Sequence, residues 1–325
     1  MADAVPAPPL RRRPLGSTGL NVTEIAIGAW AIGGGARVAD RAMGYGTTDD
    51  AVSLAALARA FERGVNFVDT ADSYGNGHSE LLVGKALRNS PRRVHIATKV
   101  GTVRRDPEPP KKDFSPDYIR HACERSLHRL GVTSLDLYQL HNPPLETLAD
   151  RAVWNTLRAL KDAGKIEHYG VSVASPEEGL LAIQHGEVET IQVAYNLLER
   201  EAAKQLFARA EQKGVGIIVR VPLASGLLTG KFAADHRFAE DDHRRDRFPP
   251  DRLARDLERV ERFRFLAQDT GRTLAQAALK FCLVPEAVST VIPGAKTADQ
   301  VNENLAAAAV PDFTPEELQR IEAIS

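Results

Sequence analysis

Short apolar segments alternate with longer segments of helical periodicity eight times along this sequence. In the longer segments apolar residues recur every three to four positions, as on one face of a helix, whereas the short apolar runs are typical of buried strands. One repeat takes roughly 35 residues, which favours βαβ units and a parallel sheet. Eight strands close such a sheet into a (β/α)8 TIM barrel, the α/β fold that we expect. The predicted strands are residues 24–30, 65–69, 95–99, 134–141, 166–173, 189–196, 216–222 and 287–294, and the predicted helices are residues 49–64, 79–89, 115–131, 146–164, 175–186, 200–214, 252–281 and 297–308.

An open, doubly wound sheet is the alternative architecture. It would show a G-x-G-x-x-G turn between its first strand and first helix. Three glycines at residues 33–35 follow the first predicted strand, but they lack that spacing and no helix follows at once. The barrel is therefore the favoured fold.

Several further segments fit around the barrel. Residues 15–24 predict a β-hairpin before the first strand, and Thr47 or Thr48 is the expected cap of the first helix. A last helix over residues 314–324 should pack across the outside or the bottom of the barrel. Two more segments follow strand ends and are too long to be simple connectors. We expect both to be lids over the C-terminal face of the barrel; they are residues 101–114 and 229–251.

Length and composition are those of an ordinary globular protein. A chain of 325 residues with 43% hydrophobic and 26% charged residues can bury a sizeable core, and barrels of this size form one domain. We expect residues 1–325 to be a single barrel domain, with residues 1–10 as a disordered tail rich in Pro and Ala. The net charge of −1 gives no support for a nucleic-acid or membrane partner, because both require a basic surface.

Cysteine content and hydropathy predict a soluble cytoplasmic protein. Cys123 and Cys282 lie among apolar residues of helical segments, which fits buried reduced thiols better than a disulfide or a metal site. The N-terminus has no apolar leader core, and no run approaches the about 18 apolar residues of a membrane span. The sequence leaves open whether the protein is a monomer or a homo-oligomer.

Polar residues stand where six of the predicted strands end. Barrel chemistry takes place at that end, while the opposite end serves stability. Each residue alone is weak evidence, because a lone histidine is more often structural and a lone cation can be a surface charge. Together they predict one site at the mouth of the barrel, formed by Asp69, Lys99, His141, Ser172, Gln192 and Arg220.

Tyr74, five residues after Asp69, supplies a phenol to this site. A nearby ammonium favours the phenolate, so Lys99 should lower the pKa of Tyr74 until it can release its proton near neutral pH. Tyr74 would then act as a general acid towards a carbonyl oxygen, with His141 as orienting donor and Asp69 holding Lys99 in place. An aromatic residue that only caps the loop is an equally good explanation of Tyr74.

Seven motifs in this order resemble the aldo-keto reductase superfamily. The resemblance runs from about Leu15 to Leu305. It implies a (β/α)8 barrel and reversible hydride transfer between a nicotinamide cofactor, usually NADPH, and a small-molecule carbonyl substrate. It also implies that Asp69, Tyr74 and Lys99 act with His141 as the catalytic tetrad. The motifs are DTADSYG, ATKVG, LYQLHNP, VSVASPEE, IQVAYN, PLASGLLTGK and VIPGAKTADQVNEN.

The same resemblance implies how the nicotinamide is held. Ser172 and Gln192 match residues that bind the carboxamide, but Val173 replaces an asparagine of the family pattern, so one hydrogen bond should be missing. Arg220 occupies the position of an aromatic residue that commonly stacks on the nicotinamide. A guanidinium can stack too, but its charge disfavours the cationic oxidised ring, so we expect Arg220 to favour the reduced cofactor.

The rest of the cofactor site is less well matched. A Lys-Ser pair and an arginine that bind the 2′-phosphate in many members correspond here to Gly294, Ala295 and Gln300, with Lys296 nearby. This pattern resembles the bacterial branch similar to potassium-channel β-subunits, which implies NADPH, with NADH possible; glycine at a helix N-terminus still offers backbone N–H groups to phosphate. Trp30 and Tyr45 should wall the substrate pocket. The remaining candidates for cofactor binding are Trp30, Asp69, Leu223, Gly226, Lys231 and Asn304.

Two other functions remain open. A Schiff-base aldolase on the same barrel would use Lys99 as its nucleophile. A regulatory subunit, as in channel β-subunits, would bind NADPH but turn over slowly.

Overall fold

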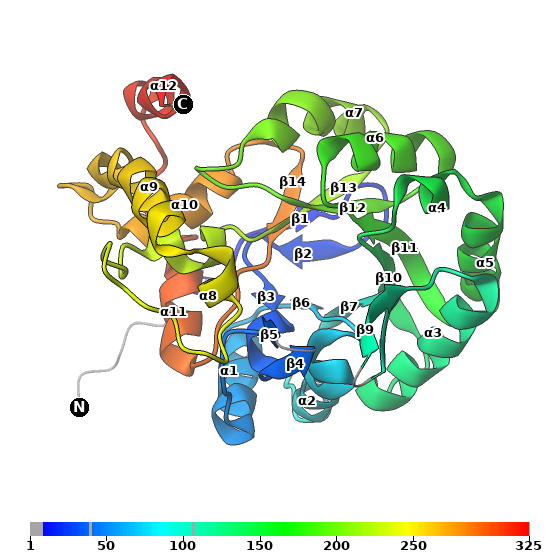
Figure 1. The fold of residues 1–325 in the computed structure, drawn as a ribbon. Coiled ribbons are helices and arrows are strands. Elements are labelled where there is room, and N and C mark those ends of the chain that lie inside the picture. The colour runs from blue at the N-terminus through cyan, green and yellow to red at the C-terminus, as the bar shows by residue number, and fades with distance from the viewer. Residues whose placement is uncertain (1–8, 39–40, 106–107, 325) are drawn as a thin grey trace.

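Eight parallel strands form one sheet that curves into a barrel, as predicted. The computed structural model describes residues 9–38, 41–105 and 108–324, so the first eight residues of the predicted tail lie outside the described part. The strand order around the sheet is β14-β13-β12-β11-β10-β7-β6-β3, and every neighbouring pair is parallel. Figure 1 looks along the barrel, with the helices surrounding the strands. The strands are β3 (Ile27–Gly28), β6 (Phe67–Asp69), β7 (His95–Val100), β10 (Leu135–His141), β11 (Ile166–Ser172), β12 (Thr190–Ala194), β13 (Gly216–Arg220) and β14 (Val288–Val291).

The barrel closes where the first strand meets the last one. β3 joins the β14 side only through isolated bridges, Ile25 to Val291 and Gly28 to Gly294. The Gly28 amide donates to the Pro293 carbonyl at 3.0 Å. The predicted first strand, residues 24–30, is too long, because the chain turns into a 3-10 helix, η1 (Ala29–Ile32), directly after Gly28.

The helices alternate with the strands as predicted, but some of their ends differ. Asp49 caps the first helix by accepting from the Val52 amide at 2.9 Å. The predicted caps were Thr47 and Thr48, and Thr47 instead donates to Asp241. The helices are α1 (Asp50–Glu62), α2 (His78–Arg88), α3 (Pro116–Leu130), α4 (Leu145–Ala149), α5 (Arg151–Asp162), α6 (Pro176–His185), α7 (Ala208–Gln212), α8 (Arg244–Arg247), α9 (Pro250–Glu261), α10 (Leu274–Cys282), α11 (Ala298–Ala306) and α12 (Pro315–Ala323), with a π-helix η3 (Ala203–Phe207) before α7 and 3-10 helices η2 (Tyr74–Gly77), η4 (Ala224–Thr229) and η5 (Arg264–Ala267).

Two long predicted helices are divided in the structure. Asp150 has an extended backbone (φ −80°, ψ 113°) and caps α5, which separates α4 from α5 within residues 146–164. Residues 252–281 contain most of α9, then η5 and α10, because Thr273 starts a new helix with a capping box. The last helix, α12, packs on the outside of the barrel through Ile321, as Figure 1 shows near the C-terminus.

A β-hairpin covers the N-terminal end of the barrel. Its strands are β1 (Arg12–Pro14) and β2 (Asn21–Thr23), which pair in antiparallel fashion. The predicted hairpin, residues 15–24, therefore started too late, since residues 15–20 form the turn. The guanidinium of Arg13 ties the hairpin to the barrel by donating to the Val288 carbonyl at 3.0 Å.

Both predicted lids follow strand ends of the barrel. The first contains an antiparallel hairpin, β8 (Thr102–Arg105) with β9 (Glu108–Lys112), and the second contains α8. A further hairpin, β4 (Ala36–Val38) with β5 (Arg41–Met43), was not predicted. Each of its strands has three residues, which is too short for the alternation of apolar and polar residues that identifies half-buried strands.

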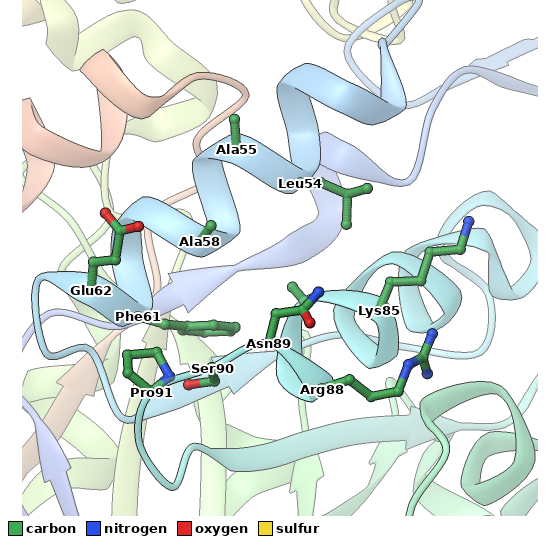
Figure 2. Close-up of a pocket in the computed structure, with 11 residues that line it drawn as sticks. Leu54, Ala55, Ala58, Phe61, Glu62, Lys85, Arg88, Asn89, Ser90 and Pro91 are labelled. Carbon is green, nitrogen blue, oxygen red and sulfur yellow. The ribbon is translucent and has the colours of Figure 1, made fainter.

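The two cysteines are buried and free, as expected. In the described part of the chain, no helix is both long and apolar enough to cross a membrane. A groove of about 720 Å³ lies on the outside of the barrel between α1 and α2. Figure 2 shows Leu54, Ala58 and Phe61 on one side of it, and Lys85 and Arg88 on the other. This groove is far from the strand ends that carry the predicted site.

Candidate active site

Strand ends bring the predicted polar residues to one cleft. Asp69, His141, Ser172 and Arg220 are the last residues of their strands, while Lys99 is the last but one of β7. The cleft has a volume of about 650 Å³ and is lined by all the predicted strand-end residues except Lys99, which is fully buried beneath it. Tyr74 also lines it.

Lys99 lies at the centre of a buried hydrogen-bond network. Its Nζ donates to Asp69 Oδ1 at 2.5 Å, to the Thr70 carbonyl at 2.8 Å and to Tyr74 Oη at 2.9 Å. All three donors of the ammonium are therefore used. Burial alone would lower the pKa of Lys99, but Asp69 and Tyr74 outweigh burial, so the pKa is raised above 10.5. Lys99 is thus positively charged, and its three N–H donors are all used within the protein.

The second oxygen of Asp69 is held by two glutamine amides. Gln192 donates to Asp69 Oδ2 at 2.7 Å, and Gln139 donates to it at 3.1 Å. Sequence reasoning missed Gln139. A signal was present, because Gln139 stands two residues before His141 in the same strand and alternate strand residues face the same side. The carboxylate is therefore fixed from both sides.

A tight turn holds Tyr74 against Lys99. The next residue, Gly75, has φ +57°, and a Cβ there would lie 1.9 Å from the Gly33 carbonyl oxygen, so this position requires glycine. The ammonium of Lys99 also lies 4.6 Å from the centre of the Tyr74 ring. The turn therefore holds the hydroxyl of Tyr74 within hydrogen-bonding distance of the Lys99 ammonium.

The expected acidification of Tyr74 is wrong for this structure. Burial raises the pKa of the phenol above 10.0, and the opposing effect of Lys99 is smaller. The prediction considered the ammonium but underestimated the burial, since a phenolate in this site would lose its solvation. Tyr74 therefore keeps its proton at neutral pH.

His141 completes the group of four. Its ring meets that of Tyr74 edge to face, with centroids 5.8 Å apart and planes at 81°. Its Nδ1 lies 3.4 Å from Ser73 Oγ, which orients the imidazole. A phenol and an imidazole thus face the same part of the cleft.

All twelve residues predicted to bind the cofactor line this cleft. At the end near Tyr74, Ser172 Oγ lies 3.4 Å from Gln192 Oε1. Arg220 donates to the Val173 carbonyl at 2.8 Å, while its Nε is buried without a partner. Among the described residues this donor is unpaired, so a water molecule or a bound ligand is needed to satisfy it. The twelve residues are Trp30, Asp69, Ser172, Gln192, Arg220, Leu223, Gly226, Lys231, Gly294, Lys296, Gln300 and Asn304.

At the other end of the cleft, the cations already have partners. Lys296 donates to the carbonyls of Tyr45 and Thr47. Lys231 pairs with Glu303 at 3.4 Å. Glu303 was not predicted, although it immediately precedes Asn304 in the quoted motif.

Residues 241–243 of the second lid are bound to the loop that follows the first strand. Both the amide and Nδ1 of His243 interact with the Gly44 carbonyl, at 3.0 and 2.8 Å. Thr47 Oγ1 donates to Asp241 at 2.8 Å. The rings of Trp30, Tyr45 and His243 pack together with centroids 4.7 to 5.0 Å apart. No sequence pattern predicted these contacts, because about 200 residues separate the partners.

The first lid approaches His141. Lys112 donates to the His141 carbonyl at 2.7 Å and to Thr102 Oγ1 at 3.0 Å. Asn142, the residue after His141, has φ +49°, and its Oδ1 is buried without a partner. Lys112, Thr102 and Asn142 line the cleft, and sequence reasoning missed all three in this role.

Residues 24–325 match the aldo/keto reductase family. The chain belongs to this family. Membership makes it a nicotinamide-dependent oxidoreductase and confirms the predicted fold and superfamily.

Three relatives span nearly the whole chain. The NADH-specific methylglyoxal reductase of Escherichia coli (strain K12) is 30% identical over 311 residues, which cover 92% of this chain and 93% of the relative. The structure of a glycerol dehydrogenase from Gluconobacter oxydans is similar with a TM-score of 0.82 at 32% identity, covering 96% of this chain and 94% of that one. The holo form of an aldo-keto reductase from Bacillus halodurans has a TM-score of 0.80 at 28% identity, covering 97% and 96%.

The cleft fits a nicotinamide dinucleotide in size and charge. Its volume of about 650 Å³ lies within the usual range for small-molecule sites, about 300 to 1,000 Å³. Four cationic residues line it, and their positive charge is compatible with a pyrophosphate; they are Lys231, Arg244, Arg247 and Lys296. Over residues 9–38, 41–105 and 108–324, no cluster of three or more His, Cys, Asp or Glu side chains is arranged to hold a metal ion.

Proposed function

We propose that this protein reduces small aldehydes or ketones to alcohols, with Tyr74 as the general acid. The observation that carries the proposal is the network in which Lys99 Nζ lies 2.9 Å from Tyr74 Oη and 2.5 Å from Asp69 Oδ1. When bound, a reduced nicotinamide supplies the hydride that adds to the carbonyl carbon. The named relatives act on methylglyoxal and glycerol, which supports a small polar substrate.

In this proposal Tyr74 donates its proton to the carbonyl oxygen as negative charge develops there. Burial keeps the pKa of the phenol raised, so the acid is fully protonated at neutral pH. Lys99 stabilises the phenolate left after proton transfer, because its ammonium is held charged by Asp69. His141 orients the carbonyl oxygen from the other side, and Ser73 holds its ring.

NADPH is the proposed cofactor. Lys231 and Lys296 line the end of the cleft where the adenosine half would lie, and Lys231 could exchange its pairing with Glu303 for a 2′-phosphate. NADH is the other candidate, since one relative is NADH-specific. Steady-state rates with both nucleotides at equal concentration decide between the two.

The geometry of Lys99 favours a reductase over a Schiff-base aldolase. An aldolase needs an accessible, neutral amine. Lys99 is 0% exposed, and its pKa is raised by Asp69 and Tyr74 against the effect of burial. Borohydride trapping with substrate should therefore leave no adduct on Lys99. A regulatory subunit with slow turnover remains the other alternative, and steady-state rates test it.

The decisive experiment replaces Tyr74 by phenylalanine. Tyr74→Phe removes the acid and keeps the ring that packs on Lys99 and His141. Carbonyl reduction should fall by at least about a hundredfold, in keeping with general-acid contributions of roughly 10² to 10⁴. NADPH affinity, measured by fluorescence titration, should be nearly unchanged. A variant that keeps most of its rate would show that another group protonates the substrate.

A further inference from the structure

One cation in the cleft has no evident role in cofactor binding. Lys112 reaches the cleft from β9 in the first lid. Within the part of the chain that the structure describes, its Nζ uses two of its three donors, on the His141 carbonyl and on Thr102, and the third N–H is available to a ligand. Among the residues described in the structure, no carboxylate lies within 4.0 Å of Lys112 Nζ.

Lys112 lies across the cleft from the other lysines. Its hairpin stands next to His141 at the end of β10, whereas Lys231 and Lys296 follow β13 and β14. β10 and β14 are far apart in the strand order of the barrel, and Figure 1 shows β9 beside β10 with α11 on another side. The charge of Lys112 therefore lies on the side of the cleft that contains His141 and Tyr74.

The surroundings of Lys112 leave its charge only partly compensated. Lys112 is exposed as a whole residue, but the partial burial of its ammonium in the cleft lowers its pKa, and Asp72 is the acid that opposes this effect. Burial, and then Glu80, raise the pKa of Asp72 itself to about 7, so Asp72 is a weak counter-ion at neutral pH. A cation with an available N–H next to the reacting group forms a suitable subsite for an oxyanion.

We propose that Lys112 binds an anionic group of the substrate, so that the preferred substrates carry a carboxylate or a phosphate a few carbon atoms from the carbonyl. This inference rests on the proposed reductase function and narrows its substrate class. The neutral carbonyl compounds suggested by the relatives are then poorer substrates for this protein.

The experiment compares matched pairs of aldehydes that differ in one anionic group. Butanal is paired with 4-oxobutanoate, and glyceraldehyde with glyceraldehyde 3-phosphate, with methylglyoxal as a further neutral compound. The wild type should show a kcat/KM at least tenfold higher for the anionic member of one pair, through a lower KM. The first pair tests a carboxylate and the second a phosphate.

Three variants test whether Lys112 causes this preference. Lys112→Gln removes the charge but keeps a hydrogen-bond donor for the His141 carbonyl, and it should reduce the preference about tenfold to a hundredfold, the worth of a charge-assisted hydrogen bond. Lys112→Arg should retain the preference. Lys111→Gln is the matched control on the same hairpin, because Lys111 is exposed and pairs with Glu108 at 2.8 Å; it should not alter the preference.

Equilibrium binding separates this proposal from the proposed function. Calorimetry of the cofactor-bound wild type with the non-reducible pair butanoate and 1-butanol should show binding of the carboxylate only, lost in Lys112→Gln. If no aldehyde is reduced with either nucleotide, the reductase proposal fails, while the calorimetry still decides the role of Lys112. If neutral and anionic members are reduced and bound equally well, or if Lys112→Gln keeps the full preference, the Lys112 proposal is refuted.

Discussion

The ion pair between Lys99 and Asp69 gives the sharpest test of how this site is held together. Asp69→Asn keeps the shape of the side chain but removes its charge, which leaves the fully buried ammonium with neutral partners alone: the amide oxygen at position 69, the Thr70 carbonyl and Tyr74 Oη. It also creates a conflict of donors. Gln139 and Gln192 both direct N–H groups at Asp69 Oδ2, and an amide nitrogen there cannot accept them.

We expect Asp69→Asn to lower the free energy of unfolding by about 3 to 5 kcal/mol at pH 7, the usual cost of removing one partner of a buried pair. The penalty should shrink as pH rises. Without Asp69, burial dominates and lowers the pKa of Lys99 below that of the unfolded chain, about 10.4. The unfolded state then binds more protons in the window below pH 10.4, so stability of the variant increases with pH there.

The measurement is urea-induced unfolding, followed by circular dichroism, at pH 7, 8, 9 and 10 for wild type and variant. The double variant Asp69→Asn/Lys99→Met is the control, because it removes both charges and should be more stable at pH 7 than Asp69→Asn alone. A penalty below about 1 kcal/mol at pH 7 would contradict the reasoning. So would a penalty that stays constant up to pH 10, since it would mean that burial does not lower the pKa of Lys99 in the variant.

Three more predictions concern Asp72, Gly101 and Arg220. Burial and Glu80 raise the pKa of Asp72 to about 7, so the folded state keeps a proton that the unfolded state releases above about pH 4. As pH rises from 4 to 8, the free energy of unfolding of the wild type should fall by up to about 4 kcal/mol relative to that of Asp72→Asn. Melting temperatures of the two proteins that change in parallel with pH would disprove this. Gly101 and Gly164 both have positive φ, but a Cβ on Gly101 would lie 2.0 Å from Phe114 Cε1, whereas one on Gly164 would meet nothing within 4 Å. Gly101→Ala should therefore lower the free energy of unfolding by about 1 to 3 kcal/mol more than Gly164→Ala. Equal losses would show that the Phe114 side chain can move to relieve the contact. Arg220→Gln should increase the affinity for the oxidised nicotinamide nucleotide relative to the affinity for the reduced one, because the cation opposite the oxidised ring is gone. Fluorescence titration measures both affinities. An unchanged ratio of the two affinities would mean that Arg220 does not face the ring.

The barrel could be predicted because its signal is repeated and local. Eight apolar runs with eight periodic helices leave few alternatives, and the rule that barrel chemistry sits at strand ends selected Asp69, Lys99 and His141. Residues 101–114 were predicted to be a lid from their length and from their position after a strand end. Their hairpin, and the part that Lys112 takes in it, could not be read from a sequence rich in Pro and charge.

The errors in the sequence analysis arise from contacts between distant residues. Thr47 is a good helix cap by type, but Asp241, 194 positions away, binds it instead. The pKa of Tyr74 depends on the balance between burial and the charge of Lys99. Its direction could not be obtained from residue types, because only the three-dimensional structure determines how completely the phenol is removed from water.

The seam between β3 and β14 has a consequence for synthesis on the ribosome. β3 consists of Ile27 and Gly28, and its neighbour on one side is β6. Within the described residues, its other edge is met by residues near Val291 and Gly294. Nearly nine-tenths of the polypeptide must therefore emerge before that edge is covered. Until then the nascent chain exposes an unpaired strand edge beside Asp69, and the pocket becomes complete only with the last strand.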